Sequence, residues 1–121
     1  MKLIGILIGS ENPDLLVEYY ARIFGAAGWV EGGYTGWQIG DGYVTVGPHD
    51  QVVGQSVHPG RVIWNIESTD VPGDFARFRD AGAIVVREPY EMGEGYQGWI
   101  ATFADPDDNY FQLMSPMSAP S

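Results

Sequence analysis

The sequence predicts an α+β fold in which a strand–helix–three-strand unit occurs twice. Two amphipathic helical patterns stop at Gly25 and Gly82, about half a chain length apart, and each lies between one strand pattern and three further ones. The 121 residues, with 45% hydrophobic and 18% charged side chains, can form one compact domain with a buried core. We therefore expect an internal duplication that closes around one cavity. Its expected parts are a first module at 1–48, a linker at 49–59, a second module at 60–116 and a tail at 117–121.

An apolar strand opens the first module. Its side chains alternate between two faces, and one row consists of Ile4, Ile6 and Ile8. The pair Asn12-Pro13 marks the start of a helix that ends at Gly25, with asparagine as the cap and proline in the first turn. Because this helix has one apolar face, we expect it to cover the isoleucine row and to leave Gly5 on the uncovered face. Glycine-rich turns then separate short strands at 28–31, 34–39 and 43–47.

The second module repeats this order. A strand at 61–67 is followed by a helix at 71–81, for which Thr69 or Asp70 is the expected cap. Strand alternation predicts a core row of Val62, Trp64 and Ile66. The remaining strands are expected at 83–88, 98–103 and 110–115, with a glycine-rich loop before the second of them that could act as a lid.

A dense turn signal, Ala104–Asn109, precedes the last strand. Pro106 fixes one backbone angle, and Asp108 is a residue type that tolerates left-handed backbone. The strand that follows places Tyr110, Gln112 and Met114 on one face and two large apolar residues on the other.

The face of the sheets that no helix covers is the candidate site, because alternation sends polar or small side chains to it. A single aromatic residue there is more often a core residue, but a filled core would not accommodate Arg61, Asn65 and Gln112. Aromatic side chains with a few polar groups are the usual composition of a small-molecule pocket. The expected ligand-binding residues are Tyr43, Thr45, Arg61, Asn65, Trp99, Tyr110, Gln112 and Met114, with Trp37 close by. No catalytic residue is assigned.

Composition excludes several functions. The net charge of −10, with 6 Lys and Arg, is unfavourable for binding nucleic acid. It is compatible with a cationic or neutral ligand, but an acidic composition most often serves solubility alone. The absence of cysteine removes disulfides and thiolate metal ligands. The first apolar run is typical of a buried strand rather than a signal peptide, and no run is long enough to span a bilayer, so we expect a cytoplasmic protein without a membrane partner.

Three segments resemble the vicinal oxygen chelate superfamily, which includes glyoxalase I, bleomycin-resistance proteins and type I extradiol dioxygenases. These segments are Glu18–Gly25, Asp70–Val71 with Ala81–Ala83, and Asp105–Leu113. The last is similar to the closing Asp-Pro-Asp-Gly-Asn motif, with Asp108 in the glycine position. The resemblance implies two βαβββ modules whose curved mixed sheets form a cup, with the helices on the convex side, the site on the concave face, and commonly a homodimer.

Metal-using members of the superfamily hold their metal with His, Glu or Gln in the first and last strands of each module. The corresponding positions are Gly5, Thr45 or Gly47, Ile63 and Gln112. An open catalytic metal site needs about three imidazole or carboxylate ligands, and only Gln112 could coordinate, weakly. The resemblance therefore implies no metal and no cofactor, as in metal-free bleomycin-resistance-like members.

Two functions follow. The first is sequestration of a small aromatic or cationic molecule in the concave cleft. The alternative is a metal-independent or weakly metal-dependent lyase, isomerase or dioxygenase of the same superfamily, in which Arg61 stabilises an oxyanion and Tyr43, Tyr110 or Glu67 moves a proton. Whether the protein is an enzyme is left open.

Overall fold

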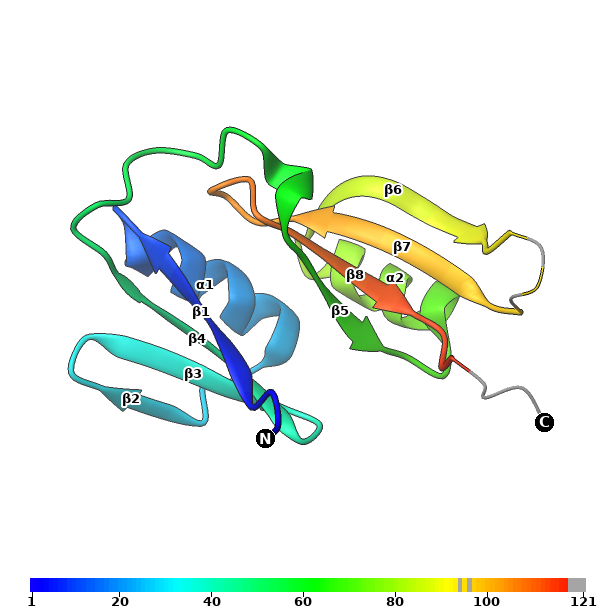
Figure 1. Ribbon diagram of the computed structural model, residues 1–121, viewed down its shortest axis with the longest axis horizontal. Helices are drawn as coiled ribbons and strands as arrows, with labels where there is room; N and C mark the ends of the chain where they lie inside the picture. Colours follow the sequence, from blue (N-terminus) through cyan, green and yellow to red (C-terminus); the bar gives the residue numbers. More distant parts are fainter. Residues whose placement is uncertain (94, 96, 118–121) are drawn as a thin grey trace. The chain divides into compact units, whose positions relative to one another are not determined.

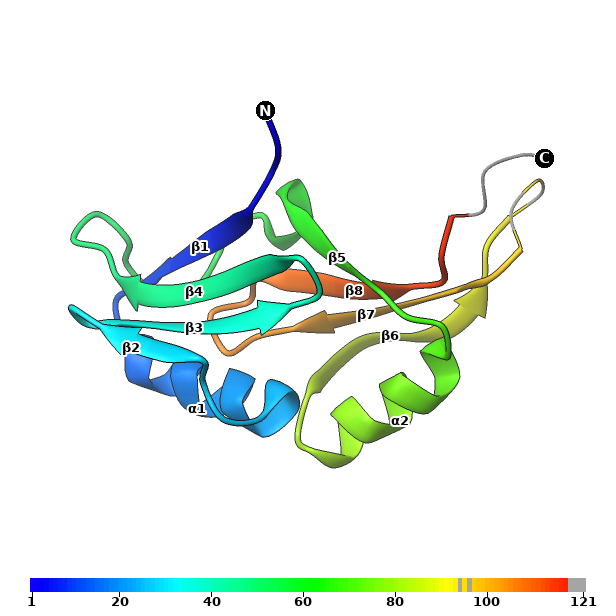
Figure 2. The same cartoon turned by 90° about the horizontal axis from the view of Figure 1, so that it is seen from below.

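The computed structural model describes residues 1–93, 95 and 97–117 and confirms the α+β fold with two βαβββ modules. The chain divides into two compact units between Gln55 and Ser56, and both have the element order expected from sequence (Figure 1). In each unit the helix lies against one face of its own sheet (Figure 2). Of the expected lid and tail, residues 94, 96 and 118–121 lie outside the described residues.

The first unit contains one helix and a four-stranded mixed sheet. Its elements are β1 (Gly5–Ser10), α1 (Pro13–Phe24), β2 (Trp29–Glu31), β3 (Tyr34–Ile39) and β4 (Gly42–Pro48). The sheet order is β1-β4-β3-β2, with β1 parallel to β4 and the other neighbours antiparallel. This pattern follows from the chain order, because α1 is the crossover that parallel β1 and β4 require and the short turns join antiparallel neighbours.

The core of the first unit lies between α1 and the sheet. Ile8 of the isoleucine row is buried as expected, whereas Ile4 precedes the strand and is 49% exposed. Asn12 occupies the N-cap position, but its side chain makes no capping bond with described residues; its backbone N–H donates to Ser10 Oγ at 3.0 Å. The other buried apolar side chains of this core are Leu16, Tyr19, Tyr20, Ile23, Trp37, Val44 and Val46.

The second unit has the same topology. A 3₁₀ turn, η1 (Pro59–Arg61), precedes β5 (Ile63–Glu67), α2 (Val71–Asp80), β6 (Ile84–Glu91), β7 (Trp99–Ala104) and β8 (Tyr110–Met114). The sheet order is β5-β8-β7-β6, again with the first pair parallel. Asp70 is the cap of α2, because its Oδ1 accepts from the Gly73 N–H at 3.1 Å.

Aromatic rings dominate the core of the second unit. Phe103 of β7 stacks on Phe75 of α2 and on Phe111 of β8, with ring centroids 5.4 and 5.3 Å apart. Trp64 extends the stack, 5.0 Å from Phe111, which confirms its place in the core row of β5. Val62 is not in that row: it precedes the strand and is 74% exposed.

Candidate functional site

The uncovered face of the first sheet is aromatic. By strand register, Trp29, Gly36, Thr45 and Leu7 form one row across the sheet on the side away from α1. Tyr43 belongs to the same face, because it pairs with Gly5. Tyr43 and Thr45 thus lie on the expected face, next to Leu7, which is 60% exposed.

Three rings on this face occupy the space above glycines. A Cβ on Gly5 would collide with the Tyr43 ring, one on Gly36 with Trp29, and one on Gly47 with Tyr34. A strand glycine permits such close approach because it has no side chain of its own. Trp29 and Tyr43 also touch each other edge to face, with ring centroids 5.7 Å apart. The glycines therefore make room for an aromatic surface that consists of Trp29, Tyr34 and Tyr43.

The uncovered face of the second sheet is polar at its centre. One row across all four strands runs from Asn65 through Gln112 and Thr102 to Arg87. Its flanking rows contain Tyr110 and Met114, so four of the expected ligand-binding residues share this face. Those four are Asn65, Tyr110, Gln112 and Met114.

Two contacts fix side chains within this polar face. Gln112 Nε2 donates to Thr102 Oγ1 at 3.0 Å, which leaves the amide oxygen of Gln112 available as an acceptor. The Arg87 guanidinium lies over the Tyr90 ring, 3.6 Å from its centroid. This geometry suits a cation–π contact.

The two tryptophans expected near the site lie elsewhere. Trp37 is 2% exposed, pairs with core residue Val44, and donates from its indole N–H to the Gly25 carbonyl at 2.9 Å. It therefore belongs to the core between α1 and the sheet. Trp99 lies on the same face of β7 as Ala101 and Phe103, which are both fully buried. It therefore shares the side of the second sheet that carries α2.

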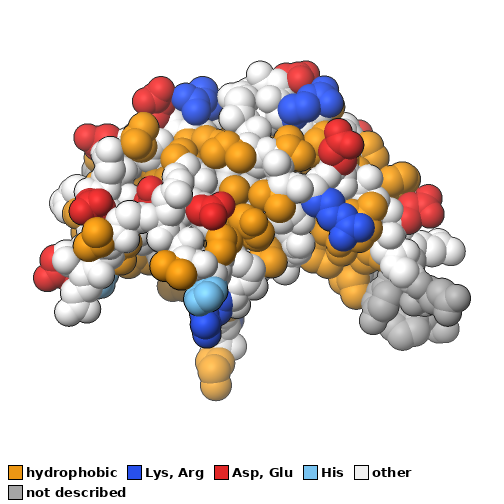
Figure 3. Space-filling view, turned by 90° about the horizontal axis from the view of Figure 1, so that it is seen from above, with side chains coloured by type: hydrophobic (Ala, Val, Ile, Leu, Met, Phe, Trp, Pro, Cys, Tyr) orange, Lys and Arg blue, Asp and Glu red, His pale blue; other side chains and the backbone are white. Residues whose placement is uncertain are grey.

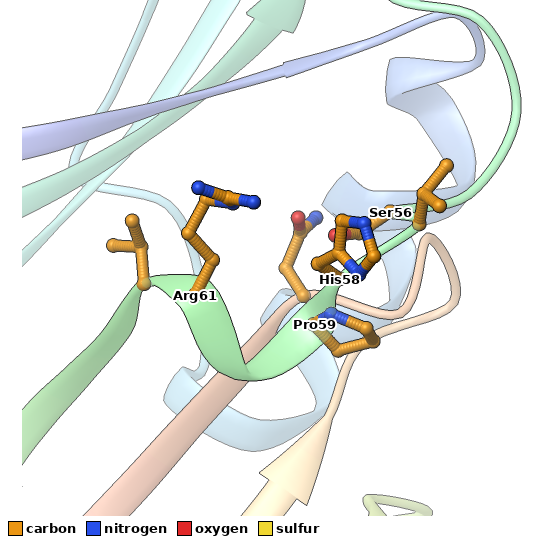
Figure 4. Close-up of a pocket in the computed structure, with 7 residues that line it drawn as sticks. Ser56, His58, Pro59 and Arg61 are labelled. Atoms are coloured by element: carbon orange, nitrogen blue, oxygen red, sulfur yellow. The ribbon is translucent and has the colours of Figure 1, made fainter.

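Arg61 also differs from expectation. It ends η1 instead of opening β5, and it lines an open pocket of ≈ 370 Å³ within the second unit (Figure 4). The described residues that line it are Ser56, Val57, His58, Pro59, Arg61, Val62 and Asn109.

One wall of this pocket is fixed by the turn between β7 and β8. Asp105 Oδ1 accepts from the backbone N–H groups of Asp107 and Asn109 at 2.9 and 3.0 Å. The Asn109 side chain donates from Nδ2 to both oxygens of the same carboxylate, at 3.2 and 3.0 Å. Asp108 has φ 64°, so the left-handed backbone expected at this position is confirmed. The turn that resembles the family motif thus holds Asn109 rigidly.

The family model that matches this sequence is the glyoxalase-like domain, and the match extends over residues 5–114. The chain belongs to the glyoxalase-like family. This membership and its structural neighbours support the vicinal oxygen chelate superfamily expected from the three sequence segments. No functionally curated protein matches the sequence of this glyoxalase-like protein significantly.

Solved structures share the fold at low sequence identity. A glyoxalase-related enzyme from Fulvimarina pelagi is 17% identical with a TM-score of 0.73, and the alignment covers 96% of this chain and 88% of that one. A glyoxalase/bleomycin resistance protein/dioxygenase family enzyme from Burkholderia phytofirmans PsJN is 17% identical with a TM-score of 0.71, and the alignment covers 95% of this chain and 98% of that one. Lactoylglutathione lyase from Agrobacterium tumefaciens is 13% identical with a TM-score of 0.69, and the alignment covers 94% of this chain and 92% of that one.

The residues at the superfamily's metal-ligand positions do not fit a metal. The Gly5 position is filled by the Tyr43 ring, and Ile63 has no donor atom. Gln112 uses its amide nitrogen on Thr102. Among residues 1–93, 95 and 97–117, no group of three or more His, Asp or Glu side chains could hold a metal ion.

Charge and hydrophobicity are mixed on the surface. Figure 3 shows acidic and basic side chains interspersed with hydrophobic ones on one face of the molecule. No helix within the described residues is long and apolar enough to cross a membrane.

Sequence reasoning missed several residues of the uncovered faces. Trp29 and Tyr34 lie in short strands next to glycines, and the glycines in the paired strands were the available signal. Thr102 and Arg87 could be placed only once the pairing of β6, β7 and β8 was known, because bulges interrupt the register of β6.

Proposed function

We propose that this glyoxalase-like protein binds a small aromatic or cationic molecule on the uncovered faces of its sheets and acts by sequestering it. The observation that carries the proposal is the aromatic surface of the first unit, where Tyr43, Trp29 and Tyr34 occupy the space above glycines. A sheet face made only for solubility would present polar side chains. This face instead presents ring area, which stacks favourably on flat aromatic molecules.

Charge supports a cationic ligand. Aromatic rings attract cations, and a protein with a net charge of −10 raises the local concentration of cations around it. In the second unit, the free amide oxygen of Gln112 and the neighbouring Asn65 are acceptors suited to ligand N–H groups.

Binding of proflavine, a planar aromatic cation, tests the proposal by fluorescence titration. We expect Tyr43→Leu to weaken proflavine binding about tenfold, because it removes a cation–π partner while keeping apolar volume. Leu15→Ala is the control, since Leu15 lies on α1 and is 49% exposed. The double variant Gln112→Ala with Tyr110→Ala should weaken binding without unfolding the protein. Equal affinities for Tyr43→Leu and Leu15→Ala would contradict the proposal.

Chemical turnover and metal content provide a second test. Native mass spectrometry with elemental analysis of the purified protein should detect a co-purified organic ligand and no stoichiometric metal. Conversion of the methylglyoxal–glutathione adduct, or cleavage of a catechol, well above the background rate would favour the enzymatic alternative instead.

A further inference from the structure

The pocket beside η1 has a composition that differs from the rest of this acidic protein. Among the described residues, its lining contains Arg61 and His58 but no aspartate or glutamate. Asp107 and Asp108, which belong to the adjoining turn, are not part of the lining. Figure 4 shows the Arg61 and His58 side chains rising from the same side of the Pro59–Arg61 turn. Basic groups are therefore gathered at a pocket whose described lining contains no acidic side chain.

Arg61 is also distinguished from the other arginines by its contacts. Arg22, Arg77 and Arg79 each pair with an acid and lie near an aromatic ring, and Arg87 lies over Tyr90. Arg61 has no ion pair or ring contact with any residue in the described part of the chain. A guanidinium without an intramolecular partner, at the edge of a pocket, is well placed to pair with an anion from solution.

The backbone around Arg61 is held in place before any ligand arrives. Its N–H donates to the His58 carbonyl at 3.0 Å, and the Ser56 N–H donates to the Asp107 carbonyl at 2.7 Å. Asn109, which also lines the pocket, is fixed by the buried carboxylate of Asp105. Preorganised walls lower the entropy cost of binding.

We propose that this pocket binds a small organic carboxylate, with Arg61 as the main partner of the anion and His58 as a second donor. The apolar walls of the pocket, Val57, Pro59 and Val62, select an anion with a hydrophobic body over a small inorganic one. Val57 and Val62 are 84% and 74% exposed, so a ligand would cover apolar area that is otherwise in water. The lining of this pocket shares no residue with the aromatic surface or with the polar row around Gln112, so the proposal does not depend on the proposed function.

Benzoate and benzamide form a matched pair of probes, because they have the same ring and differ in charge. Titration of the ¹⁵N-labelled protein at low ionic strength should shift the amide signals of residues 56–62 and 109 with benzoate. Benzamide should bind about tenfold more weakly, which is the expected loss for a hydrogen bond to a charged group. Inorganic phosphate should also bind more weakly than benzoate.

Arg61→Gln should weaken benzoate binding about tenfold and leave benzamide binding unchanged. Arg79→Gln is the matched control, because the Arg79 side chain on α2 in the same unit is 51% exposed and pairs with Asp80 at 3.2 Å. Equal binding of the two probes, benzoate shifts outside this pocket, or an Arg61→Gln variant that binds benzoate like Arg79→Gln would overturn the proposal. Amide spectra of both variants without ligand show whether the fold is retained.

Discussion

Replacement of Asp105 is the change that we expect to destabilise the second unit most for its size. The side chain is 1% exposed, and its carboxylate accepts four hydrogen bonds, two from backbone N–H groups and two from the Asn109 amide. Hydrogen bonds to a charged group contribute about 1.5–3 kcal/mol each, but bonds in one network are not additive. Removal of the carboxylate also leaves donors without their acceptor inside the turn.

We therefore expect Asp105→Ala to lower the free energy of unfolding by about 3 kcal/mol, near the upper end of single substitutions. For a domain of this size that corresponds to a fall in Tm of about 12 °C. Asp105→Asn should lower the free energy of unfolding by about half as much as Asp105→Ala, because one acceptor oxygen remains while the new NH₂ group faces the Asn109 NH₂.

Urea denaturation followed by circular dichroism measures both variants. Asp50→Asn is the control, because the Asp50 side chain is 95% exposed and its nearest ionic partner, His49, is 3.8 Å away. If Asp105→Ala unfolds at a urea concentration close to that of the control, the carboxylate does not organise the turn and our reading of this motif is wrong.

Three further predictions concern a strand glycine, the carboxylate of Asp74 and the oligomeric state. Gly36→Val should destabilise the protein by about 1–2 kcal/mol in denaturation experiments, because its side chain displaces Trp29, whereas Gly60→Ala, which meets no atom within 4 Å, should behave like wild type. The pKa of Asp74 is lowered, first by the hydrogen bond from Ser68 and then by Arg77, so this carboxylate stabilises the fold above its ordinary pKa of 3.8. That contribution disappears as the pH falls through the lowered pKa of Asp74, and it amounts to less than about 1 kcal/mol of the free energy of unfolding. Asp74→Asn should therefore remove this part of the pH dependence of unfolding. We also expect a homodimer, as is common in the superfamily, with twice the 13.3 kDa chain mass in light scattering at micromolar concentration. A chain that stays monomeric there would contradict this expectation.

Local chemistry made the turns and helix ends predictable. Asp70 caps α2 and Asp108 has left-handed backbone, both because short polar side chains satisfy or tolerate those backbone geometries. Strand alternation was informative within the strands, and it placed Ile8 and Trp64 correctly in the core rows.

Strand ends were not predictable, because a strand continues only where a partner continues. The pairing of β5 with β8 begins at Ile63 and Tyr110, directly after the turn that ends at Asn109. Arg61 has no ladder partner and forms a 3₁₀ turn instead. This changes the candidate site, because Arg61 lines a pocket together with His58, which belongs to the segment expected to be the linker.

The positions of Trp37 and Trp99 show that residue type alone does not predict which face of a sheet a side chain occupies. Trp99 was expected to bind the ligand and Trp37 to lie close by, but Trp37 shares a face with Thr35 and Trp99 shares a face with Phe103, which places both on the helix sides. The rule of alternation was available for both residues.

The two uncovered faces differ although the two units share one topology. In the first unit, glycines at positions such as Gly5 and Gly47 make room for rings. In the second unit, the position that corresponds to Gly5 is Ile63, and the centre of the face is occupied by the hydrogen-bonded pair Gln112 and Thr102. Neither face contributes to the core beneath its helix, so both could change while the fold was kept. Family membership therefore predicts which face of each sheet carries the function, and the residues on that face decide the ligand.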